Sequence, residues 1–160
     1  KNFYISFSIV ALIYFLDRVT KIYIIQLDKN NLGSDIFNST YLNIVLIWNK
    51  GIAFGLFSFN ESNLYNILSL IISIIVVILV IMSLKSHGFK RYSLLMIVGG
   101  ALGNLHDRIF FNAVPDFIDF HVGNFHWFIF NVSDIFITLG VISMIILELA
   151  DNKTEKENND

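Results

Sequence analysis

The sequence contains no cysteine among its 160 residues. A disulfide framework, a thiolate nucleophile and a cysteine-based metal site are therefore excluded. The formal net charge is only -2, which argues against a nucleic-acid partner because such proteins carry a basic stripe. The four histidines are scattered along the chain rather than grouped in a metal-ligand pattern. We therefore expect a function that uses neither a metal nor another cofactor.

Apolar residues make up most of the chain. They make up 55% of the chain, and the mean hydropathy is +0.65, well above that of a soluble domain. A helix needs about 20 mostly apolar residues to cross a bilayer, and suitable stretches lie at residues 3–26, 64–84, 92–112 and 127–150. The sequence predicts an α-helical integral membrane protein with four transmembrane helices, built as one domain over residues 1–150.

The ends of these segments indicate an orientation. The short loop between the second and third segments holds Lys85, Lys90 and Arg91 without an acid, which marks the cytoplasmic side. With four crossings, both termini are cytoplasmic, and residues 28–63 and 113–126 lie outside. The first segment lacks a small-residue cleavage pattern, so we interpret it as retained. The acidic stretch 151–160 is predicted to be a solvated, disordered tail.

Four aspartates fall in one layer under this topology. A rise of about 1.5 Å per residue places Asp17, Asp107 and Asp134 in the outer parts of three different helices, and Asp116 directly after the third helix. A carboxylate at membrane depth costs at least a few kcal/mol, so such residues usually face a polar interior and carry function. Two of them meeting would suit acid–base chemistry.

The segments outside the membrane are rich in aromatic and β-branched residues. Residues 41–48 and 52–57 are joined by a turn-like Asn49-Lys50-Gly51, which predicts a hairpin and a small sheet at the outer interface. Residues 117–127 mix aromatic side chains with Asp119 and His121, as in a segment that lies in the headgroup region.

Several polar residues admit a purely structural interpretation. The glycines Gly99 and Gly103 are typical of close helix packing. Asp17 and Lys21 have the spacing of a local helical ion pair. Asn104 and Asp107 share a helix face, where Arg108 can pair with a carboxylate, and a buried salt bridge would explain Asp107 as well as a functional role would.

The strongest candidates for chemistry lie near the last two helices. Asn131 and Asp134 share a face with Thr138 that points into the bundle, and an unpaired acid there favours catalysis. Ser133 lies beside Asp134 but has no suitably placed base, which argues against a serine nucleophile. Spacing alone does not choose between Asp116 and Asp119 as the second acid.

The polar clusters, taken together and in order, resemble a known family. They are DRVTK at 17–21, NKGIAFG at 49–55, GGALGNLHDR at 99–108, VPDF at 114–117 and FNVSD at 130–134. This ordered set closely resembles the bacterial lipoprotein signal peptidase, signal peptidase II, over nearly the whole chain. Pro115, Phe128 and Ser133 differ from the residues more common in that family, but every catalytic position is filled.

The resemblance implies an intramembrane aspartyl endopeptidase of the bacterial inner membrane. It would act, without a cofactor, on prolipoproteins whose cysteine already carries diacylglycerol, cutting just before that cysteine among the membrane lipids. The resemblance assigns the catalytic dyad to Asp116 and Asp134, and the sheet and the segment after Asp116 to a periplasmic cradle and an interfacial helix region. The other polar positions around the site would be Asp17, Asn49, Asn104, Asp107, Arg108 and Asn131.

A proton-coupled transporter or channel is the main alternative, because intramembrane Asp and Asn residues also line ion paths. A proton relay should carry polar residues across the whole bilayer, whereas the inner halves of the four segments are almost purely apolar. A non-enzymatic scaffold would leave Asp134 unexplained.

Overall fold

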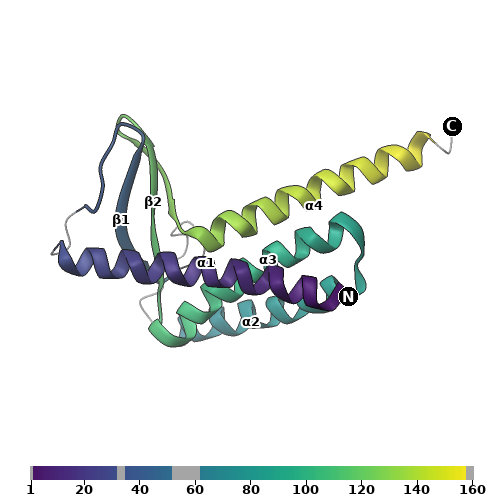
Figure 1. The fold of residues 1–160 in the computed structure, drawn as a ribbon, viewed down its shortest axis with the longest axis horizontal. Coiled ribbons are helices and arrows are strands. Elements are labelled where there is room, and N and C mark those ends of the chain that lie inside the picture. Colours follow the sequence, from purple (N-terminus) through teal and green to yellow (C-terminus); the bar gives the residue numbers. More distant parts are fainter. Residues whose placement is uncertain (1, 32–34, 52–61, 158–160) are drawn as a thin grey trace.

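A computed structural model describes residues 2–31, 35–51 and 62–157 as four helices and three strands (Figure 1). In chain order the elements are α1 (Asn2–Asn30), β1 (Leu42–Asn49), α2 (Ser62–Lys85), α3 (Gly88–Phe111), β2 (Val114–Val122), β3 (Phe125–Phe130) and α4 (Val132–Glu157). The strands gather at one end of the helices, and both chain termini lie toward the opposite end.

Helix α3 is the centre of the bundle, because it packs against α1, α2 and α4. Its glycines allow this close approach, as the GxxxG pattern predicted. A Cβ at Gly99 would lie 2.9 Å from the Cβ of Ile13 on α1. A Cβ at Gly103 would lie 2.6 Å from Asp17 Oδ2 and closer still to Ser133 Oγ. Alanine at Gly103 would therefore push α3 away from both α1 and α4.

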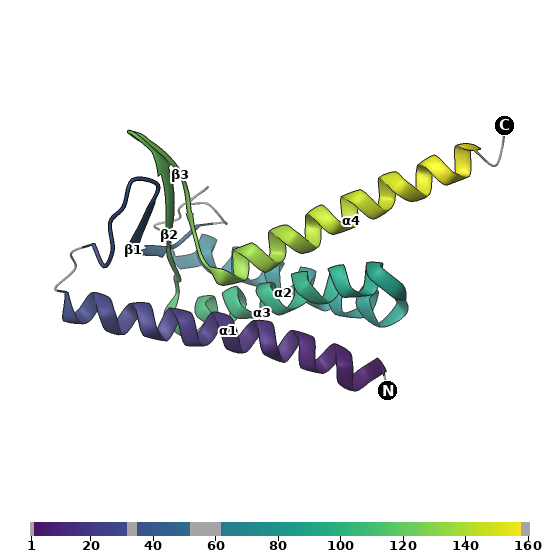
Figure 2. The same cartoon turned by 45° about the horizontal axis from the view of Figure 1, so that its top comes forward.

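The strands form one antiparallel sheet in the order β1-β2-β3. Asn43 pairs with Asp119 and Ile47 with Asp116, with a register shift between the two pairs. Figure 2 shows the β2–β3 hairpin rising from the helix ends beside the start of α4. Asn112 ends α3 in the left-handed conformation (φ 53°), and Gly123 (φ 59°) occupies the hairpin turn, where a positive φ matches the twist of the strands.

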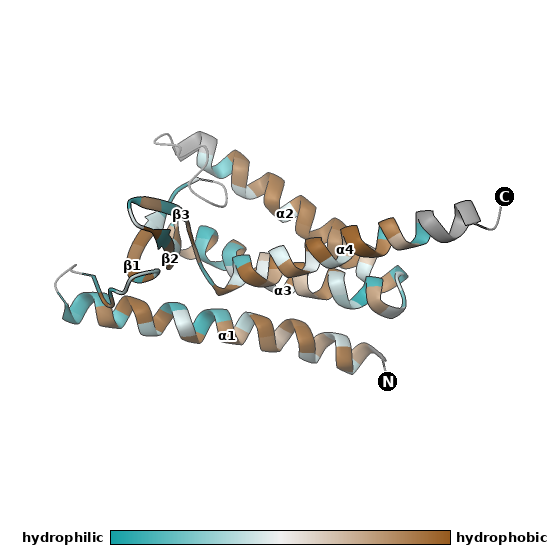
Figure 3. Cartoon of the chain, turned by 90° about the horizontal axis from the view of Figure 1, so that it is seen from above, coloured by the Kyte–Doolittle hydropathy of each residue, from teal (hydrophilic) through white to brown (hydrophobic). Residues whose placement is uncertain are grey.

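Among the described residues, three helical segments are long and apolar enough to cross a membrane, namely Tyr65–Lys85, Gly88–Phe111 and Val132–Asp151. Side chains on α2 such as Leu70 and Ile74 are more than half exposed, as expected of a helix that faces lipid. The apolar character of α2 and α4 and the polar patches of α1 are visible in Figure 3. The first predicted segment forms a helix too, but it is not among these three.

Two predictions about the region before α4 were wrong, one about where the helix begins and one about the type of secondary structure. The fourth helix begins at Val132 rather than at residue 127, because Phe125–Phe130 is a β-prone aromatic run that forms β3. For the same reason the segment after Asp116 is a strand hairpin and not a helix lying at the interface. β1 pairs with β2, and the predicted partner run 52–57 lies outside the described residues.

The helical part of α4 also continues further than expected. It extends to Glu157, into a stretch that the sequence indicated to be disordered. Glu and Lys are good helix formers, so an established helix can continue through them without burying a core.

Candidate active site

The buried first half of strand β2 carries Asp116 to the ends of the helices. Its carboxyl is only 3% exposed and accepts hydrogen bonds from two amides. Asn49 Nδ2, at the end of β1, lies 2.9 Å from Asp116 Oδ2, and Asn131 Nδ2 lies 2.6 Å from Asp116 Oδ1. Burial first, and then the charge of Asp134, raise the pKa of Asp116 from 3.8 to about 7, although the hydrogen bonds from the two amides lower it.

Asp134 lies in the first turn of α4 and is 5% exposed. Its Oδ2 accepts a hydrogen bond from the backbone N–H of Asn131 at 3.2 Å, while Asn131 Oδ1 accepts one from the backbone N–H of Asp134 at 3.1 Å. This reciprocal pair is a capping box, which satisfies free N–H groups at the start of the helix. Asp134 Oδ1 accepts a further hydrogen bond from Asn104 Nδ2 at 2.8 Å.

Asn131 therefore connects the two acids. Because its Oδ1 faces an obligate backbone donor, its Nδ2 must face Asp116. Asn49 is oriented in the same way, since its Oδ1 accepts a hydrogen bond from the backbone N–H of Gly51 at 2.8 Å. The amides around the site are fixed by geometry, and each directs a donor at a carboxyl group.

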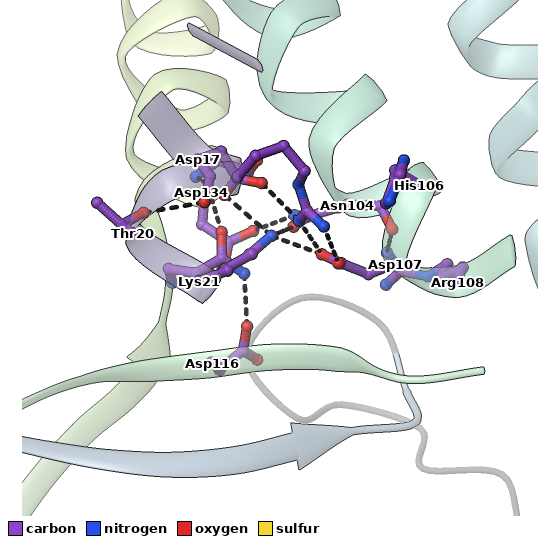
Figure 4. A network of polar contacts seen from close by, with 12 residues as sticks. Asp17, Thr20, Lys21, Asn104, His106, Asp107, Arg108, Asp116 and Asp134 are labelled. Carbon is purple, nitrogen blue, oxygen red and sulfur yellow. Dashed lines mark hydrogen bonds and ion pairs between the residues drawn. The ribbon is translucent and has the colours of Figure 1, made fainter. Parts of the chain in front are cut away.

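A cluster of four charged residues lies between α1 and α3 beside these acids (Figure 4). Lys21 Nζ lies 2.9 Å from Asp17 Oδ1 and 2.7 Å from Asp107 Oδ2. Arg18 completes the cluster, with Nη2 2.9 Å from Asp17 Oδ2 and Nη1 2.6 Å from Asp107 Oδ1. Asp17 also accepts a hydrogen bond at 3.0 Å from the backbone N–H of Ser133, which links the cluster to the start of α4.

Arg108 has a different role from the one expected. Its guanidinium donates to the backbone carbonyls of Asn104 at 3.2 Å and Gly51 at 3.1 Å. Within the described ranges it forms no ion pair, and Asp107 is paired instead by Arg18 and Lys21. Arg108 thus joins the end of β1 to α3 beside the two acids.

Asp119 belongs to a separate cluster. It is 4% exposed, and both of its oxygens lie close to His126 Nδ1, at 2.9 and 3.1 Å. Asn43 Nδ2 donates to it at 3.2 Å, and His121 Nε2 lies 3.0 Å from Asn43 Oδ1. Asp119 thus stabilises the sheet rather than contacting Asp134. The part of the chain that the structure describes contains no group of three His, Asp or Glu side chains suited to a metal ion.

A largely apolar cavity of about 280 Å³ opens beside Asp134. It is lined by Trp127 and Phe130 of β3 and, on α4, by Asp134, Ile135, Thr138 and Leu139. One acid of the site therefore meets a space that suits an apolar ligand.

The structure brings together every polar residue that the sequence singled out for the site. Arg18 and Lys21 also contribute to the site, and neither was predicted to do so. The spacing of Asp17 and Lys21 showed a local ion pair, which is present, but contacts across to α3 leave no signal in a single sequence.

The chain is similar to known proteins along most of its length. The family described as signal peptidase (SPase) II matches residues 9–150. A lipoprotein signal peptidase of Pelagibacter ubique (strain HTCC1062) is 48% identical over 99% of this chain and 96% of its own length. One from Anaplasma phagocytophilum (strain HZ) is 41% identical over 91% and 92%. A solved bacterial membrane enzyme at 31% identity superposes with a TM-score of 0.75 over 95% of this chain and 92% of that one.

Proposed function

Since the chain belongs to the signal peptidase II family, and is a membrane protease that removes signal peptides from prolipoproteins, we propose that Asp116 and Asp134 are its catalytic dyad. The observation that carries the proposal is the amide of Asn131, which donates to Asp116 and accepts from the backbone of Asp134. One rigid group thereby holds two buried carboxyls from different elements at one place.

The chemistry follows from two buried acids that share one proton. Two neighbouring carboxylates cannot both ionise cheaply, so one stays protonated and the pair titrates as a unit. The ionised member takes a proton from a water molecule as the water oxygen bonds to the scissile carbonyl carbon. The protonated member donates its proton to the carbonyl oxygen, which would otherwise become an oxyanion. The peptide C–N bond then breaks as the nitrogen takes the proton that the first carboxyl received from water. A hydroxyl proton of the intermediate returns to the second carboxylate as the new carbonyl forms, which restores the dyad.

The surrounding residues orient this pair. Asn49, Asn104 and Asn131 direct amide donors at the carboxyl oxygens. Asp17 and Asp107 belong to the neighbouring charge cluster, and Arg108 ties β1 to α3. All of them support the dyad from outside, and none is itself a proton donor or acceptor in the reaction.

The substrate is a prolipoprotein whose cysteine carries diacylglycerol, and the cut falls just before that cysteine. The apolar cavity beside Asp134 supports this choice, because apolar walls next to the acid suit a substrate that reaches the site from the lipid. Asp134 and Trp127 lie at the sheet end of α4, so the scissile bond would meet the dyad near one membrane surface.

The test is direct. Purified protein is incubated with a diacylglyceryl-modified prolipoprotein, and the released signal peptide is measured by mass. Asp116→Asn and Asp134→Asn should each abolish cleavage while the protein still inserts, since each change removes proton transfer at nearly constant shape. Asp119→Asn is the matched control and should be far milder. Near-normal turnover by either dyad variant would refute the assignment.

The topology belongs to the same proposal. Helix α1 forms a fourth crossing, residues 1–150 form one domain in the bacterial inner membrane, both termini are cytoplasmic and the sheet is periplasmic. The absence of native cysteine makes this measurable with single introduced thiols. In intact spheroplasts, a membrane-impermeant maleimide should label Asn124→Cys in the hairpin turn. It should label Ser86→Cys in the α2–α3 turn only after lysis, and the reverse pattern would invert the topology.

A further inference from the structure

Lys21 is a fully buried ammonium group, with 0% of the residue exposed. It has three N–H donors and meets three acceptors, namely Asp17 Oδ1 at 2.9 Å, Asp107 Oδ2 at 2.7 Å and Asn104 Oδ1 at 2.8 Å. Its hydrogen-bonding capacity is saturated, so it has no donor left for a substrate. Figure 4 shows these groups meeting between α1 and α3.

The contact with Asn104 has a consequence for the dyad. An ammonium group only donates, so the amide oxygen of Asn104 must face Lys21 and the amide nitrogen must face the other way. That nitrogen lies 2.8 Å from Asp134 Oδ1. A flipped amide would direct N–H groups at the ammonium and an oxygen at the carboxylate, and both contacts would be repulsive. Lys21 therefore fixes a donor toward Asp134.

The two acids consequently lie in unequal environments. Asp134 receives an amide polarised by Lys21, a backbone N–H and the positive end of a helix, all of which favour a negative charge. Asp116 receives hydrogen bonds from two neutral amides, those of Asn49 and Asn131. The charged groups facing Asp134 from the neighbouring elements are Lys21 on α1, Arg108 on α3 and Asp116 on β2.

We propose that Lys21 is a positioning residue for the reaction: acting through the Asn104 amide, it holds Asp134 as the ionised member of the dyad and leaves the shared proton on Asp116. Asp134 is then the group that takes the proton from water, and Asp116 the group that donates to the carbonyl oxygen. This inference depends on the dyad proposed above.

Arg18 supplies the matched comparison. It carries the same charge as Lys21 and pairs with the same two carboxylates, Asp17 and Asp107. Its hydrogen bonds do not involve Asn104. If Lys21 only balanced the charge of the cluster, removing Lys21 or Arg18 would change the protonation of the dyad to the same extent. If Lys21 acts through Asn104, removing Lys21 changes the protonation of Asp134 more than removing Arg18 does.

The experiment is the pH dependence of kcat/KM for cleavage of a lipidated prolipoprotein, which reports the essential acid and base of the free enzyme. Lys21→Met should move the acid limb to higher pH by about one unit, because ionised Asp134 loses the polarised donor and a nearby positive charge. Arg18→Met should leave the acid limb close to its wild-type position. Equal shifts in the two variants would overturn the proposal.

Asn104→Ala keeps the whole charge cluster and so keeps the test valid even if Lys21→Met does not fold. It should move the acid limb in the same direction by about one unit, since the ionised form of Asp134 loses the hydrogen bond from Asn104 Nδ2. Adding Lys21→Met to Asn104→Ala should then shift the limb by less than Lys21→Met does alone, because only the direct effect of the Lys21 charge on Asp134 remains to be lost. An unmoved acid limb in Asn104→Ala, or additive shifts in the double variant, would overturn the inference.

The two proposals fail in distinguishable ways. Full activity of Asp116→Asn or Asp134→Asn would refute the dyad itself. An inactive dyad variant combined with an unmoved acid limb in Asn104→Ala would refute only the role of Lys21.

Discussion

If Asp116 and Asp134 form the proposed dyad, cleavage should slow as the pH rises above about 7, because that mechanism requires the protonated form of Asp116. Burial, together with the charge of Asp134, holds the pKa of this carboxyl at about 7 instead of 3.8. A difference of this size corresponds to about 4 kcal/mol of disfavour for the ionised form. One pH unit above the pKa, about a tenth of the molecules retain the proton, so kcat/KM should fall about tenfold per unit.

Removing Asn49 should move this alkaline limb in a defined direction. Asn49 Nδ2 donates to Asp116 Oδ2 at 2.9 Å and stabilises the ionised form, which lowers the pKa. Asn49→Ala removes that donor, so the pKa rises and the midpoint moves to higher pH. A neutral hydrogen bond contributes about 0.5–1.5 kcal/mol, which corresponds to a shift of about half to one pH unit.

The assay is the rate of signal-peptide release from a lipidated substrate in detergent micelles, measured from pH 5 to pH 9 at constant ionic strength. Asn43→Ala is the control, because Asn43 lies on the same strand but donates to Asp119. Its midpoint should match that of the unaltered protein. A midpoint near pH 4, a downward shift in Asn49→Ala, or an equal shift in both variants would refute this reasoning.

Three further outcomes are expected. Gly103→Ala should lower the unfolding temperature, because the new Cβ would lie 2.6 Å from Asp17 Oδ2 and closer still to Ser133 Oγ, and such overpacking costs about 1–3 kcal/mol. Adding Ser133→Ala should restore part of the lost stability. An unchanged unfolding temperature in Gly103→Ala would count against the packing described. A precursor with an unmodified cysteine should show a large drop in kcat/KM, since each buried methylene contributes about 0.8 kcal/mol, and equal cleavage of both precursors would point to a general protease. Activity should survive exhaustive chelation. A loss of activity on chelation that added zinc reverses would instead require a metal mechanism.

The sequence was most informative about the site, because polar residues inside apolar segments are costly at membrane depth and therefore stand out. The predicted topology and the helical rise together placed Asp17, Asp107, Asp116 and Asp134 in one layer, and the structure brings these four residues together. The choice between Asp116 and Asp119 could not be made from spacing. It depends on strand alternation across β2, which directs Asp116 toward Asn131 and Asp119 toward His126.

The fold was predictable where hydrophobicity dictates it and less so at the boundaries. The long apolar runs of α2 and α3 gave those helices to within a few residues. The start of α4 was misplaced because Phe125–Phe130 is as apolar as a transmembrane helix, and only strand pairing with β2 separates the two. Partners distant in the sequence, such as Arg18 with Asp107, depend on how the helices pack.

The capping box at the start of α4 also bears on how the enzyme comes into being. Asn131 and Asp134 belong to the last of the four helices to be synthesised, while Asp116 precedes them on β2. Until that final helix forms its first turn and docks against α3, Asp116 lacks both an amide donor and its partner acid. The proposed dyad therefore leaves the nascent chain inert as a hydrolase throughout its own insertion, and we expect proteolytic competence to arise in one step when the last helix docks.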